Sequence, residues 1–299
     1  MQIVRLPRDA SLAQQRLVPV KAELLQLARR HRHDTDAYFK QMPALSPADD
    51  DFQIDFPGQR QPYPVGYCRQ IRDRVWDNLS NEALICSLRK QGLTWKKVYF
   101  IEKGGWFQNA IQCGDWLLDV AHDTVDATDA PIICVPLDEP LWENLNDWHR
   151  FAEVAAAYYH LTLYPNLYFP LLFPLIPFLA VRATGRLELL YNQQMLFFLD
   201  LGDNWRRILA LLEDQNLMER TLPLTLEKRL LEMTAADGEP FPVEIRKCSS
   251  TELRQALREW GQIRRLPRQQ LAATLQNFEK LAGLAARRLR QANIFMASA

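Results

Sequence analysis

The sequence lacks an excess of charge of either sign. Its 36 lysines and arginines balance 36 aspartates and glutamates, so the formal net charge is zero at pH 7. A chain without a net field gives no reason to expect binding to nucleic acid or to an anionic membrane surface. We therefore expect neither partner, and any other partner must be recognised by a local feature.

Cysteine is also scarce, and no pair has the Cys-x-x-Cys spacing of a zinc or redox site. The N-terminal residues lack both the long apolar segment and the small-residue cleavage site of a secretory signal. We therefore expect reduced thiols in a cytoplasmic protein, with no metal and no cofactor. The five cysteines are Cys68, Cys86, Cys113, Cys134 and Cys248.

Apolar runs long enough to cross a bilayer are missing as well. The most apolar stretch, residues 167–181, is shorter than the roughly 20 residues that span a membrane, so we expect no membrane span. Pro170, Pro174 and Pro177 prevent it from forming one regular helix. Buried packing is the favoured interpretation. A groove wall or a surface for a protein partner is the alternative.

What the chain does have is enough apolar material for a large core, with 299 residues of which 48% are hydrophobic. The pattern predicts an α+β fold in three parts: an N-terminal helix within 1–40, a core of helices and antiparallel strands over 41–135, and a mostly helical region over 136–299. The predicted helices are 11–30, 68–79, 81–91, 141–159, 204–218, 225–235, 251–262 and 267–296; the predicted strands are 98–102, 106–113, 116–120, 132–135, 187–191 and 195–199; and 41–66 is a long loop.

A β-hairpin over 106–123 has the clearest local pattern. Gly114-Asp115 is suited to a two-residue turn, and alternating residues flank it. This turn sets the register, in which Cys113 faces Trp116. The pairs then continue away from the turn, as far as Ala110 facing Asp119. Gln108 then lies one diagonal step from Asp119 on the same face. The hairpin therefore predicts a carboxylate aimed at position 108.

Cys68 begins the helix predicted for 68–79. A thiol at a helix N-terminus lies at the positive end of the helix dipole, and Arg69 and Arg72 add positive charge nearby. These features favour the thiolate form, which is the nucleophile. The alternative is a small buried apolar residue, the commonest fate of a free cysteine.

Together these segments resemble the transglutaminase-like branch of the papain-like cysteine folds, over about residues 60–135. That family places Gly-x-Cys at the head of a helix and follows it with a hairpin whose second strand ends in a Trp-x-x-Asp-like run. The corresponding residues are Gly66-Tyr67-Cys68 and Trp116-Leu117-Leu118-Asp119. The resemblance implies a nucleophile at Cys68 and an orienting carboxylate at Asp119. By the predicted register, Gln108 occupies the position of the family's catalytic histidine.

Glutamine cannot act as the missing base, because its neutral amide does not titrate near neutrality. Three alternatives remain. In the first, Cys68 acts as a thiolate, and Asp119 and Gln108 arrange the substrate or the oxyanion. In the second, His122 replaces the missing base, which requires a bulge because a regular strand points it away from Asp119. In the third, the protein is a pseudo-enzyme.

The function we predict is cysteine-dependent acyl transfer or hydrolysis on an amide, ester or thioester, with a small-molecule, acyl or peptide substrate. The alternative is a non-catalytic binding or scaffold protein that uses the retained cleft and the apolar 167–181 segment. Two polar groups are not expected to bind metal. They are the run His31-Arg32-His33-Asp34-Thr35-Asp36, expected near a helix end, and Asp123, Asp126 and Asp129, expected to be solvated turn residues.

Overall fold

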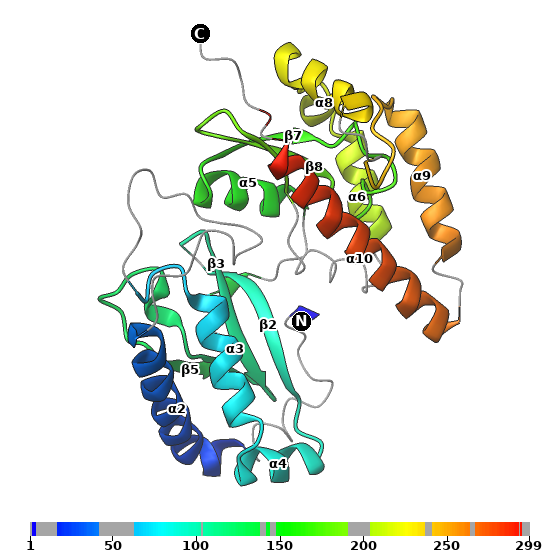
Figure 1. Cartoon of the computed structure of the whole chain (residues 1–299). Helices are drawn as coiled ribbons and strands as arrows, with labels where there is room; N and C mark the ends of the chain where they lie inside the picture. The colour runs from blue at the N-terminus through cyan, green and yellow to red at the C-terminus, as the bar shows by residue number, and fades with distance from the viewer. Residues whose placement is uncertain are drawn as a thin grey trace. The chain divides into compact units, whose positions relative to one another are not determined.

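The structure is a computed structural model, in which the chain divides into two compact units, Met1–Asn146 and Asp147–Ala299. We call them unit 1 and unit 2 and describe each by itself (Figure 1). The residues described are 2–3, 17–41, 63–102, 104–137, 142–143, 148–190, 204–236, 241–263, 267–292 and 294. Both units combine helices with antiparallel strands, so the predicted α+β class is confirmed, whereas a transglutaminase-like core remains a prediction.

Unit 1 packs helices against a curled sheet. The helix predicted for 68–79 is found with those bounds, and the sheet follows the predicted meander. The region expected to form a separate N-terminal helix belongs to the same unit, because α2 packs on α3. The elements are β1 (Gln2–Ile3), η1 (Val18–Val20), α2 (Lys21–Gln41), α3 (Cys68–Leu79), α4 (Ala83–Lys90), β2 (Trp95–Glu102), β3 (Trp106–Cys113), β4 (Trp116–Asp119), η3 (His122–Thr124), β5 (Ile133–Pro136) and β6 (Trp142–Glu143).

The sheet has the order β1-β2-β3-β4-β5, and β6 also pairs with β2. The hairpin register is the predicted one: Cys113 pairs with Trp116, and Ile111 pairs with Leu118. Gly114 at the turn has φ 57°, a backbone conformation that glycine adopts without steric cost. The local turn chemistry therefore fixed the pairing, as expected from a Gly-X hairpin.

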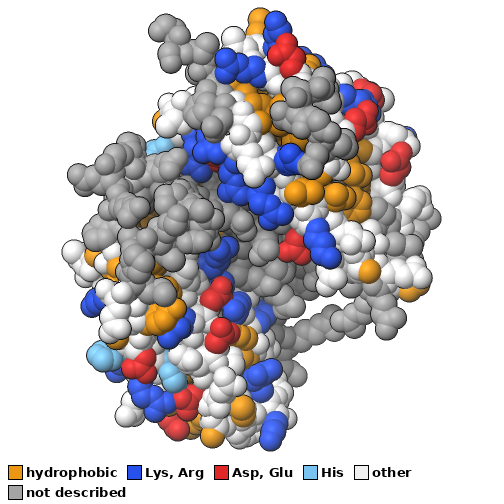
Figure 2. Space-filling view, viewed as in Figure 1, with side chains coloured by type: hydrophobic (Ala, Val, Ile, Leu, Met, Phe, Trp, Pro, Cys, Tyr) orange, Lys and Arg blue, Asp and Glu red, His pale blue; other side chains and the backbone are white. Residues whose placement is uncertain are grey.

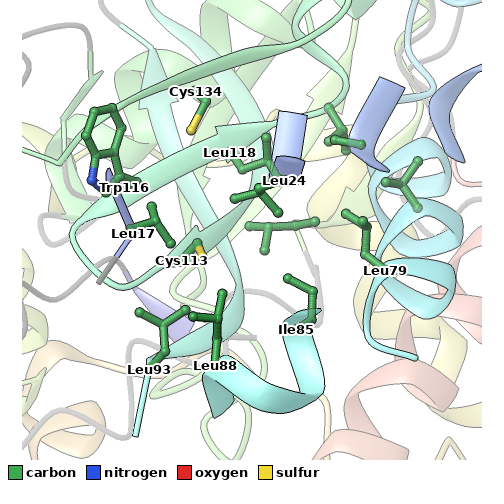
Figure 3. Close-up of a cluster of buried hydrophobic side chains, with 14 of the residues drawn as sticks. Leu17, Leu24, Leu79, Ile85, Leu88, Leu93, Cys113, Trp116, Leu118 and Cys134 are labelled. Atoms are coloured by element: carbon green, nitrogen blue, oxygen red, sulfur yellow. The ribbon is translucent and has the colours of Figure 1, made fainter. Parts of the chain in front are cut away.

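One face of this sheet is covered by α2, α3 and α4. Alternation along each strand sends Ile111 and Leu118 to this face, which we call the helix face. Ala110 and Leu117 point to the other face and pack with Val98 and Phe100. Figure 3 shows part of the helix-face core, whose buried members include Leu17, Leu24, Ala28, Ile71, Val75, Leu79, Ile85, Leu88, Ile111, Cys113 and Leu118.

Helix α2 differs from the prediction at its C-terminal end. The sequence predicted an end near Arg30, but the helix continues through the polar run to Gln41. The reason is Arg32, which is buried and donates to the carbonyl oxygen of Val120 at 2.7 Å and to both carboxylate oxygens of Asp123 at 2.8 and 2.9 Å. One residue of the polar run, Arg32, therefore makes buried contacts inside unit 1. Asp123 is buried as well, so it is not the solvated turn residue we expected.

Unit 2 combines a three-stranded antiparallel sheet, in the order β7-β8-β9, with six helices in the described residues. The four predicted C-terminal helices are found, the first of them divided into α6 and α7. The helix predicted for 141–159 is shorter, because Trp142 lies in a strand instead. The predicted strand 195–199, the first part of helix 11–30 and nearly all of loop 41–66 lie outside the described residues. The elements are α5 (Trp148–Tyr158), β7 (Leu161–Pro165), β8 (Phe178–Arg182), β9 (Leu187–Leu189), α6 (Asn204–Glu213), α7 (Gln215–Met218), α8 (Leu224–Ala236), α9 (Ser250–Ile263) and α10 (Arg268–Gln291).

The apolar 167–181 segment forms part of the core of unit 2. Phe169, Phe173 and Ile176 are each at most 1% exposed, and the last four residues of the segment belong to β8. Leu171 is its exposed large apolar side chain. Buried packing is therefore confirmed. The same burial gives no support to a partner surface made of this segment, since those side chains are already covered.

No helix in the described residues is long and apolar enough to cross a bilayer. Figure 2 shows basic and acidic side chains on the visible face of both units, as expected for a chain with no net charge.

Candidate functional site

Cys68 is the first residue of α3, and the turn before it is anchored to the end of the hairpin. Gly66 has φ 80°, which suits glycine, and its N–H donates to the carbonyl oxygen of Thr124 at 3.0 Å. The N–H of Tyr67 donates to the Pro64 carbonyl oxygen at 3.0 Å. The half-buried thiol is therefore held at a helix N-terminus, as the sequence predicted.

The side chain that contacts the thiol is Asn109, which the sequence reasoning missed. Its Nδ2 donates to the Sγ of Cys68 at 3.1 Å, and the Asn109 side chain is almost fully buried. A donor at this distance lowers the cost of negative charge on sulfur. The Asn109 side chain is a neutral amide that does not titrate near neutrality. It can therefore orient the thiol but cannot serve as its base.

Arg72 lies one helical turn after Cys68 and is also buried. Its Nε donates to Asp73 at 2.8 Å, and its Nη1 donates to the carbonyl oxygen of Val98 at 3.3 Å. Burial lowers the pKa of Arg72, and the charges of Asp73 and Cys68 act against that shift. The guanidinium is thus close enough to interact electrostatically with the thiol.

Gln108 lies on the other face of the sheet. Because it precedes Asn109 in a regular strand, its side chain points away from the helix face. Its Nε2 donates to the carbonyl oxygen of Ala121 at 3.0 Å, and its Oε1 accepts the N–H of Asn109 at 3.0 Å. The predicted register was right, but the face was wrong. The strand residue that reaches Cys68 is Asn109 and not Gln108.

Asp119 shares the face of Gln108, as the predicted register required. Leu118 is on the helix face, so the next residue points to the opposite side. Asp119 is buried, and its Oδ1 accepts the N–H of Ala121 at 2.8 Å. The two polar side chains thus both bind the peptide groups of Ala121, and the sheet lies between them and the Asn109 side chain.

His122 comes to Asp119 without the bulge that we expected to be necessary. Strand β4 ends at Asp119, and the chain then turns into η3. This change of direction puts Nδ1 of His122 3.6 Å from Oδ2 of Asp119 and 3.5 Å from Oε1 of Glu102. Alternation along β2 puts Glu102 on the same face as Gln108, because Phe100 pairs with Gln108.

The electrostatics of this carboxylate–histidine cluster are consistent with its burial. The Asp119 carboxylate raises the pKa of His122. Burial raises the pKa of Asp119 and also that of Glu102, and in both cases His122 acts in the opposite direction. A protonated His122 between two carboxyl groups lowers the cost of burying their charge.

The predicted site is therefore divided between the two faces of one sheet. Cys68, Asn109 and Arg72 lie on the helix face and provide a thiol, a hydrogen-bond donor and a positive charge. Asp119, His122 and Glu102 lie on the opposite face with Gln108, and these three titratable side chains can exchange protons. The helix-face group can favour a thiolate, but neither Asn109 nor Arg72 can move a proton to a leaving group.

The other cysteines differ from Cys68 in burial. Cys113, Cys134 and Cys248 are buried; burial raises the pKa of each thiol, to about 11 for Cys134. Cys86 is half-buried like Cys68, and its Sγ lies 3.5 Å from the carbonyl oxygen of Ser80. Cys86 is therefore the matched control for any test of Cys68 reactivity.

Several of the residues considered as metal ligands already have hydrogen-bond or charged partners. His31 contacts Glu82 at 2.6 Å, while Arg32 holds Asp123. Asp126 binds the backbone and the hydroxyl group of Thr128. Across the described residues, no group of three or more histidine, cysteine or acidic side chains is arranged to hold a metal ion.

Comparisons of the chain with protein-family models, with curated proteins and with solved structures gave no match.

Proposed function

We propose that unit 1 catalyses thiol-dependent acyl transfer, with Cys68 as the nucleophile. The observation that carries this proposal is the 3.1 Å contact from Asn109 Nδ2 to Cys68 Sγ at the start of α3. The helix N-terminus, the amide donor and the nearby Arg72 all favour negative charge on sulfur. The thiol can then lose its proton to solvent before reaction, so that no base is needed at the moment of attack.

The substrate class follows from the chemistry of Asn109 and Arg72, since neither side chain gives up a proton near neutrality. In the first step, the thiolate forms a bond to the acyl carbonyl carbon and the bond to the leaving group breaks. An amine must be protonated to leave, whereas a thiolate leaves as an anion. We therefore favour a thioester over an amide. The acyl group then passes from Cys68 to water or to another nucleophile.

The test is acylation of the protein by a simple acyl thioester, followed by intact-protein and peptide mass spectrometry. We expect one acyl group on Cys68 and loss of that product in Cys68→Ala. Cys86→Ala is the matched control and should be acylated on Cys68 at the wild-type rate. The Cys86 thiol is not at the first position of its helix and does not have the Asn109 contact, so its removal should change little. Acylation of Cys86 as fast as Cys68, or none of Cys68, would contradict the proposal.

Asn109→His provides the complementary test, since it places an imidazole next to the thiol. General acid–base transfer is typically worth about 10² to 10⁴ in rate. We expect the variant to hydrolyse an activated amide that the wild type leaves intact. If the folded variant hydrolyses the amide no faster than the wild type, the reaction of Cys68 is not limited by the missing proton transfer, and the proposal loses this support.

A second candidate function is a non-catalytic binding unit that has kept the fold without the chemistry. It is favoured by the separation of Cys68 from the Asp119–His122 pair on the other face of the sheet. In that case Cys68 is a packed side chain held by Asn109. Cys68→Ala would then leave every function of the protein intact, and the thiol would not be acylated faster than Cys86.

A further inference from the structure

Unit 2 contains a cavity of about 380 Å³ between α5, β7, β8 and the segment around α7. Small-molecule sites in proteins have volumes from about 300 to 1,000 Å³. The cavity is therefore large enough for a compact organic molecule. It lies within unit 2 and does not depend on the chemistry proposed for Cys68.

One side of the cavity is apolar. Leu161 and Leu163 line it from β7, and Phe178 lines it from the first position of β8. Ala156 on α5 leaves space because its side chain is small. These residues suit a short aliphatic or aromatic body, which would gain free energy by leaving water.

The charged groups on the other side are mostly neutralised by one another. Asp214 caps α7 by accepting the N–H of Leu217 at 3.1 Å, and its other oxygen lies 3.1 Å from Nε2 of His149. The Leu217 hydrogen bond, followed by His149, lowers the pKa of Asp214. Glu153 is engaged by Arg150 at 3.2 Å. Both carboxylates of the cavity therefore already have a basic side chain beside them.

Arg220 is the charge that remains. It lines the cavity directly after α7 and is exposed, and among the described residues no side chain pairs with its guanidinium. An exposed guanidinium at the rim of an apolar cavity can bind a carboxylate through two parallel hydrogen bonds.

We propose that this cavity binds a small organic carboxylate. The carboxylate binds Arg220, and the apolar body lies against Leu163 and Phe178. An amine is disfavoured, because it would bring a second positive charge to Arg220.

Isothermal titration calorimetry with 4-phenylbutyrate tests the proposal, with 4-phenylbutan-1-ol and 4-phenylbutylamine as uncharged and cationic probes of the same shape. We expect the carboxylate to bind at least about tenfold more tightly than the alcohol, since a charge-assisted hydrogen bond is commonly worth that factor or more. Equal affinity for acid and alcohol, or no binding of the acid at millimolar concentration, would overturn the proposal.

Two variants, Arg220→Gln and Ala156→Phe, separate recognition of the charge from occupation of the cavity, and Lys228→Gln is the control. Arg220→Gln should weaken binding of the acid about tenfold and leave that of the alcohol unchanged. Lys228→Gln removes one positive charge from an exposed position on α8 that does not line the cavity, and it should keep wild-type affinity.

Ala156→Phe should abolish binding of both acid and alcohol by filling the apolar side, without altering any charge. Wild-type affinity in either Arg220→Gln or Ala156→Phe, with an unchanged circular dichroism spectrum, would show that the acid binds elsewhere.

Discussion

The two faces of the sheet in unit 1 use polar groups in different ways. On the helix face, the Asn109 amide donates a hydrogen bond to the Cys68 sulfur beside one buried arginine. On the opposite face, the buried Asp119 and the half-buried Glu102 and His122 form a group whose members all titrate. Hydrolysis of an amide by a cysteine nucleophile uses both sets of groups around one substrate atom, because the leaving amine must be protonated. The comparison teaches that polar side chains separated by one strand thickness form a thiol–amide contact on one side and a carboxylate–histidine cluster on the other.

The largest predicted effect concerns Arg32. Its side chain binds Val120 and Asp123 in the segment that follows β4. Arg32→Met leaves the buried Asp123 carboxylate without its bidentate partner and Val120 without a donor. Breaking a buried ion pair typically costs about 3–5 kcal/mol. Urea denaturation should show a loss of unfolding free energy of that size.

Arg30→Met is the control for this prediction. Arg30 is on the same helix and contacts Glu82, but its side chain is 58% exposed. Exposed pairs are worth about 0–1 kcal/mol. Equal losses in the two variants would mean that Arg32 does not anchor this part of unit 1.

The next prediction compares neighbouring residues on the two faces directly. Asn109→Leu removes the hydrogen bond to the Cys68 sulfur, whereas Gln108→Met changes a side chain on the opposite face. We expect the rate of Cys68 alkylation by iodoacetamide near neutral pH to fall about tenfold in Asn109→Leu, because hydrogen bonds to charged groups are worth about 1.5–3 kcal/mol.

Gln108→Met should leave that rate within about twofold. Its own effect should be on stability, since it removes a donor to the Ala121 carbonyl oxygen, which also accepts from Thr124 Oγ1. If Gln108→Met slows alkylation as much as Asn109→Leu does, the two faces are not chemically separate.

The smallest effect is a pH dependence that belongs to the carboxylate face. Asp119 raises the pKa of His122 above its ordinary value of 6.5. A group with a raised pKa in the folded state stabilises that state while it is protonated. This contribution is complete below the unfolded-state pKa and is lost as the pH rises through the raised value. Unit 1 should therefore become less stable from about pH 6.5 upward.

Asp119→Asn should lower the pKa of His122 in an NMR titration and flatten the pH dependence of stability. Asp126→Asn, an exposed position in the loop after η3, should leave that pKa unchanged. The Cys68 alkylation rate should not follow the His122 titration in the wild type. A rate that did follow it would place the histidine in contact with the thiol after all.

Much of unit 1 could be predicted from local sequence. The spacing of Ile71, Val75 and Leu79 gave the bounds of α3, and the Gly114-Asp115 turn gave the strand register. These predictions succeeded because helix periodicity and tight-turn geometry depend on residues that are close in sequence.

The identity of the residue facing Cys68 could not be predicted in the same way. Both faces of β3 carry buried side chains, so alternation does not say which face α3 covers. The charged residues of β2 do not settle the question either, because Lys96 and Lys97 are adjacent and point to opposite faces. In the structure Lys97 pairs with Ile111 across the sheet, and its Nζ contacts Asp73 of α3 at 2.7 Å. Only the position of α3 therefore identifies Lys97 as the lysine on the helix face.

Asp123 shows the limit of composition-based interpretation. Aspartate after a strand is usually a turn residue, and nothing nearby in sequence contradicts that. Its partner Arg32 comes from a helix far earlier in the chain. A buried ion pair between distant segments depends on tertiary packing, which local patterns do not describe.

The pairing along the outer side of β2 has a consequence for how the protein behaves among other chains. Two short strands cover this side: β1 pairs with Val98 and Tyr99, and β6 pairs with Ile101 and Glu102. An uncovered strand offers a row of free backbone donors and acceptors to any extended peptide, which is a common start of aggregation. With these positions already paired, this side of β2 does not offer them to another chain, at little cost in chain length.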